Sequence, residues 1–394
     1  MKKLLSLALA LLMLAVMLPV VSMADEIKWE EGKNVYWQAG NSVGQTATLK
    51  DALKDAYMAN TNNGDITITC RPDSDVGSLT HGHVADNITI IGNGAYISGG
   101  ECDLEVDTYM FSRDTGSQVE SGGAYLDKDI TITASNLYNL GVWGERHTDY
   151  TVNINLTNCD SKEISGKGSV QRVYITGTTG VNNITVTGCN FLTKATALYS
   201  NADGTVVIDN CTFKGGQVPV NFNHKADGKQ IVTVKNSTFT NCGDAGEWSA
   251  FAAPVRFVNS GNGSLDATIE NNTFTGTVGT NGDILLGDQR DGQSSFNVNA
   301  EIVTKQDVTV KSGNSEKQST FEVKANTSVK ANAAGEQPEV IRDNAPIIIY
   351  TPTGDTPKTD DQKNPATGAN DLVAVAVAAA ALALAGSAII LRKD

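Results

Sequence analysis

Four short stretches of the chain repeat one pattern of apolar and polar positions. They read ITVTGCNF (184–191), VVIDNCTF (206–213), VTVKNSTF (232–239) and ATIENNTF (267–274). In each stretch, alternating apolar residues predict a strand with one face in the core. An Asn or Gly follows, where a one-residue corner needs a left-handed backbone, and a Phe comes three residues after it. Looser copies at 130–137 and 152–161 precede the four.

The repeat predicts a solenoid of stacked β-coils. Coils stacked about 4.8 Å apart would place Phe191, Phe213, Phe239 and Phe274 in one internal ladder. The alternative is a β-sandwich with coincidental similarity, but sandwich strands would not repeat the same corner. The slot after the corner holds Cys159, Cys189 and Cys211, then Ser237 and Asn272. Because Ser replaces Cys in this slot, we expect buried thiols there rather than disulfides. The pairing of Cys70, Cys102 and Cys242 stays open.

The spacing between copies varies while the corner and the Phe stay constant. From Phe to Phe the copies lie 22, 26 and 35 residues apart. This pattern resembles the right-handed parallel β-helix of the pectin-lyase-like superfamily, over roughly residues 45–325. The resemblance implies an all-β fold, a right-handed parallel β-helix occupying residues 25–330, with loops of unequal length building a binding cleft. Apolar residues at helical spacing in LKDALKDAYM (49–58) predict a short helix that caps the open end of the solenoid.

Both ends of the chain have patterns typical of export. Residues 1–24 combine two Lys residues, an apolar run and a small-residue cleavage site, so we expect a signal peptide that is removed before Asp25. An uncleaved membrane anchor is the alternative. Residues 331–363 are rich in Pro, Thr, Asp and Gly, which predicts an extended spacer.

The C-terminal residues 364–394 resemble a Gram-positive cell-wall sorting signal. The pentapeptide Asn364, Pro365, Ala366, Thr367, Gly368 precedes an apolar run at 372–391 and two basic residues. The run is long enough to span a bilayer, and the basic end favours a cytoplasmic tail. The resemblance implies that a sortase cuts after Thr367 and joins it to peptidoglycan, which places the protein outside the cell. Asn364 stands where the family usually has Leu, and a plain transmembrane anchor is the alternative.

Charge and metal-ligand patterns exclude several partners. The net charge of −14 argues against nucleic acid, because phosphate binding needs clustered Lys and Arg. His81 and His83 lack a nearby third ligand, and no Cys/His spacing fits zinc. We therefore expect no metal or other cofactor; calcium is supported by no motif.

A second series of strands carries the candidate site. In strict alternation, their outward or edge positions are Trp143, Glu145, Arg146, Arg172, Tyr174, Asn221, Asn223, His224, Lys225, Arg256 and Asp288. Aromatic rings stack on sugars, and Asn, Arg and Lys bind hydroxyls and carboxylates, so such a face would suit an extended glycan. A solvated sheet face without a ligand is the alternative.

Catalysis would need particular residues on this face. Elimination from a uronic acid needs a base and a cation that neutralises the carboxylate, roles that His224, Lys225 and Arg256 would fill. Glycoside hydrolysis needs two carboxylates about 5–10 Å apart, and the sequence shows no such pair. Three functions stay open: a surface protein that binds polysaccharide or another surface glycan, a polysaccharide lyase or glycoside hydrolase acting at the cell surface, and a structural adhesin stalk.

Overall fold

The computed structural model describes most of the chain between residues 27 and 343. Within this range it leaves out residues 62–63, 80–81, 85, 99–101, 107–108, 112–117, 121–127, 146–148, 162–172, 245–249 and 289–296. The described residues belong to one compact unit that ends at Ala345. The predicted signal peptide (1–24) and sorting signal (364–394) lie outside them.

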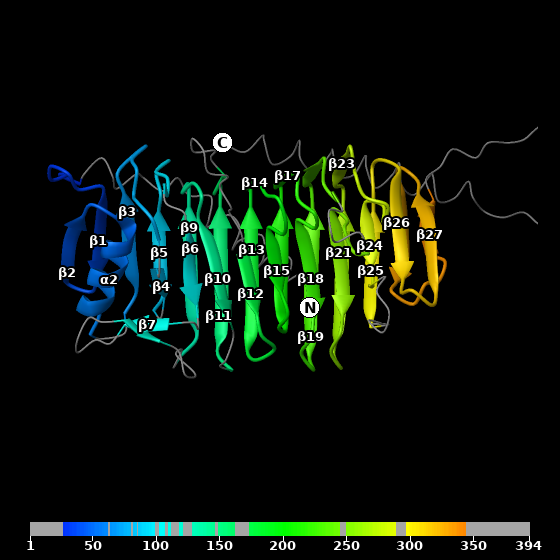
Figure 1. The fold of residues 1–394 in the computed structure, drawn as a ribbon, viewed down its shortest axis with the longest axis horizontal. Helices are drawn as coiled ribbons and strands as arrows, with labels where there is room; N and C mark the ends of the chain where they lie inside the picture. Colours follow the sequence, from blue (N-terminus) through cyan, green and yellow to red (C-terminus); the bar gives the residue numbers. More distant parts are fainter. Residues whose placement is uncertain are drawn as a thin grey trace, which may run out of the picture. The chain divides into compact units, whose positions relative to one another are not determined.

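The described residues form long sheets with mostly parallel pairing (Figure 1). The thirteen-stranded sheet contains, in spatial order, β2 (Ser42–Thr46), β1 (Val35–Ala39), β3 (Ile66–Cys70), β5 (Ile88–Ile91), β9 (Ile130–Ser135), β11 (Thr151–Thr157), β13 (Val181–Thr187), β16 (Gly204–Asp209), β19 (Lys229–Lys235), β22 (Ser264–Glu270), β25 (Val298–Val303), β28 (Thr327–Asn332) and β29 (Glu339–Asp343). The ten-stranded sheet contains β27 (Gln318–Val323), β26 (Val308–Gly313), β24 (Ile284–Leu286), β21 (Val255–Asn259), β18 (Val220–His224), β15 (Leu198–Ser200), β12 (Val173–Thr176), β10 (Gly141–Glu145), β6 (Asp103–Val106) and β4 (Gly82–Val84).

Successive strands along the chain alternate between sheets. A four-stranded sheet of β14 (Asn190–Leu192), β17 (Thr212–Lys214), β20 (Thr238–Thr240) and β23 (Thr273–Thr275) forms a third side, and β7 (Tyr109–Phe111) pairs with β8 (Gln118–Glu120). Each coil in this region thus supplies one strand to each of three sheets. The fold is all-β, with long, mostly parallel sheets, and is compatible with the predicted β-helix.

The predicted corners adopt the left-handed backbone. Asn158, Asn210, Asn236 and Asn271 have φ between 51° and 54°, and Gly188 takes the same position in its coil with φ 64°. Asn tolerates this conformation because its short polar side chain can bond locally. A Cβ added to Gly188 would lie 2.5 Å from Asn158 Oδ1, so this coil needs glycine.

The internal Phe ladder is present as predicted. Phe191, Phe213, Phe239 and Phe274 lie in register on β14, β17, β20 and β23. Their ring centroids are separated by 5.0, 4.8 and 5.0 Å, with interplanar angles of 5–11°. The first three rings are at most 1% exposed, and Phe274 is 8% exposed. The apolar interior of the coils therefore continues without a break through this region.

The slot after each corner holds a short polar or thiol side chain for a specific reason. Cys211 N donates to Ser237 Oγ at 3.1 Å, and Ser237 N donates to Asn272 Oδ1 at 2.9 Å. Two coils earlier, Cys159 N donates to Cys189 Sγ at 3.2 Å. The side chain of one coil thus satisfies a backbone N–H of the coil before it, which an aliphatic residue cannot do. None of the six cysteines, all of which are described, forms a disulfide, which confirms the expectation for this slot and answers the open question for the other three.

The two ends of the stack depart from parallel pairing. At the N-terminal end, β1 pairs antiparallel with β2 and β3, and helix α2 (Leu49–Ala59) packs against these strands (Figure 1). Thr48 caps the helix by accepting from Asp51 N, and its apolar face is buried, as the spacing predicts. This helix covers strands that would otherwise expose an unpaired edge.

At the C-terminal end the ordered sheet runs past the predicted boundary at 330. β28 ends at Asn332, and β29 pairs with it antiparallel up to Asp343. Buried Val329, Ala331 and Ala333 continue the alternation, although the composition there resembles a spacer. The first part of the predicted spacer, up to Asp343, therefore belongs to the folded sheet region, and its residues 344–363 lie outside the described residues. Within the described part of the chain, no helix is long and apolar enough to cross a membrane; the predicted span at 372–391 lies beyond that part.

Candidate functional site

Four of the predicted site residues lie in one row across the ten-stranded sheet. Strand register aligns Trp143, Tyr174, Tyr199, Asn221 and Arg256 on β10, β12, β15, β18 and β21. Their neighbours along each strand point to the core. This places the aromatic and polar candidates of five consecutive strands side by side; Tyr199 had not been singled out from the sequence.

The aromatic half of the row is half-buried. Trp143, Tyr174 and Tyr199 all have intermediate exposure. The rings of Tyr174 and Tyr199 stack with centroids 4.6 Å apart and an interplanar angle of 13°. Each of these two rings covers one face of the other, so that face is closed to a ligand. Glu105 lies beside Trp143 on the strand before it.

The polar half of the row is buried, which corrects the expectation that it faces solvent. Arg256 is 3% exposed, Asn221 6% and Asp288 0%. Arg256 Nη1 donates to Asn221 Oδ1 at 2.8 Å, and Arg256 Nη2 donates to Asp288 Oδ2 at 2.7 Å. The Phe251 ring lies 5.0 Å from Arg256 Cζ, a cation–π contact from the segment before β21. Alternation correctly predicted that Asn221 and Arg256 share one face, but Phe251 packs over Arg256 there.

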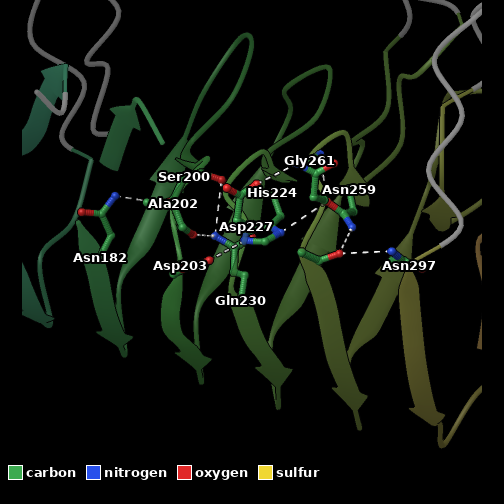
Figure 2. Close-up of polar contacts among 12 residues, drawn as sticks. Asn182, Ser200, Ala202, Asp203, His224, Asp227, Gln230, Asn259, Gly261 and Asn297 are labelled. Carbon is green, nitrogen blue, oxygen red and sulfur yellow. Dashed lines mark hydrogen bonds and ion pairs between the residues drawn. The ribbon is translucent and has the colours of Figure 1, made fainter. Parts of the chain in front are cut away.

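His224 lies in a buried polar corner and not on the outward face (Figure 2). Its Nε2 is 2.7 Å from Asp203 Oδ1, and its Nδ1 is 3.3 Å from Asn259 Oδ1. Asn259 is oriented by two other contacts: its Nδ2 donates to Gly263 O at 2.6 Å, and Gly261 N donates to its Oδ1 at 3.0 Å. Both ring nitrogens therefore lie within hydrogen-bond distance of side-chain oxygens. Through these contacts His224 links three coils. Its side chain is 0% exposed and is therefore closed to a substrate.

Further buried amides extend this corner toward the thirteen-stranded sheet (Figure 2). Gln230 Nε2 donates to Ala202 O at 2.9 Å, and Asn182 Nδ2 donates to Ser200 Oγ at 3.2 Å. Both side chains are fully buried, and register places Gly204 beside Gln230. The network fixes the turns that follow β15 and β18, which is a structural role.

The remaining predicted residues are scattered. Lys225 and Glu145 are exposed, whereas Asn223 is 7% exposed and accepts from Ser260 Oγ at 2.6 Å. Arg146 and Arg172 lie outside the described residues. His224, Lys225 and Arg256 therefore do not form one accessible constellation, since the first and third are buried in separate networks. Among the described residues, no three His, Cys, Asp or Glu side chains cluster as a metal site would require.

Some members of these networks carried no recognisable sequence signal. Asp203 lies 21 residues from His224 in the turn before β16, and Asn259 lies 35 residues from it as the last residue of β21. Neither position belongs to a recognisable sequence pattern. Tyr199 was detectable, because it occupies the same strand position as Tyr174. Comparison with protein families, with curated proteins and with solved structures gives no match for this chain.

Proposed function

We propose that this chain is an extracellular, cell-wall-anchored protein whose β-helix, similar to the right-handed pectin-lyase-like type, binds polysaccharide or another surface glycan. The observation that carries the proposal is the outward row of Trp143, Tyr174 and Tyr199 on neighbouring parallel strands. The export and sorting patterns at the two ends of the sequence support the location.

The row suits an extended ligand that runs across the strands. Adjacent strands repeat about every 4.8 Å, so consecutive coils offer chemically similar groups at regular intervals. Trp143, with its large and partly exposed indole, supplies apolar contact to a sugar ring. The phenol groups of Tyr174 and Tyr199 can donate to and accept from hydroxyls. Such a surface binds through several weak, repeated contacts.

Binding without turnover fits the described residues better than catalysis does. A lyase needs a base and a cation that both reach the substrate. The Arg256 guanidinium is already neutralised by buried Asp288, and His224 is closed off by Asp203 and Asn259. Lys225 is the one member of the proposed catalytic set with an exposed side chain. A lyase or hydrolase would therefore have to use other residues, and a stalk would need no aromatic row.

The test is retention of the full-length protein, purified in detergent, on immobilised polysaccharides. Trp143→Ala and Tyr174→Ala should each weaken retention, whereas Tyr174→Phe, which keeps the ring, should weaken it less. Tyr150→Ala is the matched control, because Tyr150 is 38% exposed and immediately precedes β11, which belongs to another sheet. Equal retention of all four variants would refute the proposed site.

Anchoring is tested separately in a Gram-positive host. Thr367→Ala should shift the protein from the peptidoglycan fraction to the membrane fraction, because the sortase no longer recognises the side chain of the residue whose carbonyl it transfers. Unchanged recovery from peptidoglycan after this substitution would contradict the sorting assignment.

A further inference from the structure

The outward face of the thirteen-stranded sheet divides into two chemically different halves. On β5, β9, β11 and β13, every outward position except Ile91 and Val181 is Thr, Ser or Asn, and none of these four described strands carries a charge there. On β16, β19, β22 and β25, the same face carries Asp209, Lys229, Lys235, Asp266, Glu270 and Glu301. An uncharged half-sheet is notable in a chain with a net charge of −14.

The uncharged half is a regular two-dimensional array, here named the hydroxyl–amide face. Its central column aligns Thr89, Thr133, Asn155 and Thr185 in strand register. The columns on either side contain Thr131, Asn153 and Asn183, and Ser135, Thr157 and Thr187. Neighbouring strands lie about 4.8 Å apart, and outward residues recur roughly every 6.6 Å along a strand. None of these ten side chains is buried, so no described segment covers the array.

Hydrogen bonds between coils hold part of the array in place. Asn183 Nδ2 donates to Asn153 Oδ1 at 3.0 Å, and Thr205 N donates to Asn183 Oδ1 at 3.0 Å. Asn153 Nδ2 lies 3.4 Å from Thr131 Oγ1. The amides of one column are therefore oriented before any ligand arrives. A preordered surface loses less side-chain entropy on binding than a mobile one.

We propose that the hydroxyl–amide face binds the ordered surface of a neutral, insoluble polysaccharide. The inference extends the proposed glycan-binding role and takes from it only the chemical class of the partner, because it concerns a different sheet. An uncharged face offers no ion pair to an acidic or basic polymer, whereas its hydroxyls and amides match a surface made of sugar hydroxyls. A flat periodic array can contact parallel glycan chains of a solid at many points, which a single soluble chain cannot supply.

The test is co-sedimentation of the full-length protein, in detergent, with cellulose, chitin and insoluble starch. The test variant is Thr133→Val/Thr185→Val, which removes two central hydroxyls and keeps β-branched side chains. Val207 already occupies this column naturally, so the fold tolerates valine there. The matched control is Thr233→Val/Thr268→Val, in the same column but among charged residues. Melting temperatures of both variants are compared with that of the wild type.

We expect the test variant to bind at least one of the solids about tenfold more weakly, with the control unchanged. Because no charges take part, retention of the wild type should persist in about 1 M salt, where the Debye length is only about 3 Å. Equal binding of the test and control variants overturns the inference. So does a loss of binding to the solids in Trp143→Ala alone, which would leave the proposed function standing on the aromatic row. The inference is also overturned if the test variant changes its oligomeric state but still sediments with the solids as the wild type does. That result would assign the face to self-association.

Discussion

Truncating Phe213 to alanine removes a central ring of the internal ladder and gives a quantitative test of the coil stacking. Phe213 is fully buried and lies between Phe191 at 5.0 Å and Phe239 at 4.8 Å, nearly parallel to both. Removing a buried Phe costs about 3–5 kcal/mol in the free energy of unfolding, through lost transfer energy and the cavity left behind. Two stacked neighbours place Phe213→Ala at the upper end of that range.

Phe274 at the end of the ladder supplies the internal comparison. It is 8% exposed, and among the ladder rings it stacks on Phe239 alone, at 5.0 Å. One stacked pair contributes about 0.5–1.5 kcal/mol beyond area burial. Phe274→Ala should therefore destabilise the protein less than Phe213→Ala by at least that amount.

Urea unfolding followed by circular dichroism measures the difference. Stacked coils contact mainly their neighbours, so the transition of each variant must first be shown to be cooperative by agreement between two probes. Equal destabilisation by Phe213→Ala and Phe274→Ala would refute the reasoning, because the ladder would then contribute no neighbour-dependent energy.

Three further predictions address the corner, the buried ion pair and the thiols. Asn236→Ala should lower the free energy of unfolding by about 1–2 kcal/mol, because alanine must adopt the left-handed backbone, and Asn236→Gly should lower it less. Chemical denaturation compares the two variants, and an alanine variant as stable as the glycine variant would contradict the corner assignment. Arg256→Ala removes the cation beside the buried Asp288 carboxylate and should lower the free energy of unfolding by about 3–5 kcal/mol. A change in melting temperature no larger than that of Lys225→Ala would show that the pair is not buried. Burial raises the pKa of Cys211 to about 12 from 9.0. At pH 8 the thiolate fraction of Cys211 in the native protein is therefore about a thousandfold below that of an ordinary thiol. Labelling of Cys211 in the native protein as fast as in the urea-unfolded protein would contradict this.

Local pattern predicted much of the fold because each coil repeats the same physical requirements. The Asn corners, the Phe ladder, the free thiols and the capping helix at Leu49–Ala59 all follow from residue types at fixed spacing. The antiparallel hairpin β1–β2 and the final pair β28–β29 were not predicted, because the ends of a stack need caps and therefore depart from the repeat.

The candidate site was less predictable, for a different reason. Alternation correctly placed Tyr174, Asn221 and Arg256 on one face, but it says nothing about which segment covers that face. Phe251 reaches Arg256 from the segment before β21, and its role depends on how that segment folds. The contact between Asp203 and His224 depends on loop lengths that vary from coil to coil. Such contacts require the three-dimensional register.

The most direct test of the central claim is equilibrium retention of the full-length protein on a panel of soluble and insoluble polysaccharides. The account predicts saturable binding to at least one of them. It also predicts that this binding weakens in Trp143→Ala or in the Thr133→Val/Thr185→Val variant, while Tyr150→Ala behaves as the wild type. Absence of binding across the panel, or binding that none of these substitutions changes, would contradict the claim that the outer faces of the coils recognise glycan.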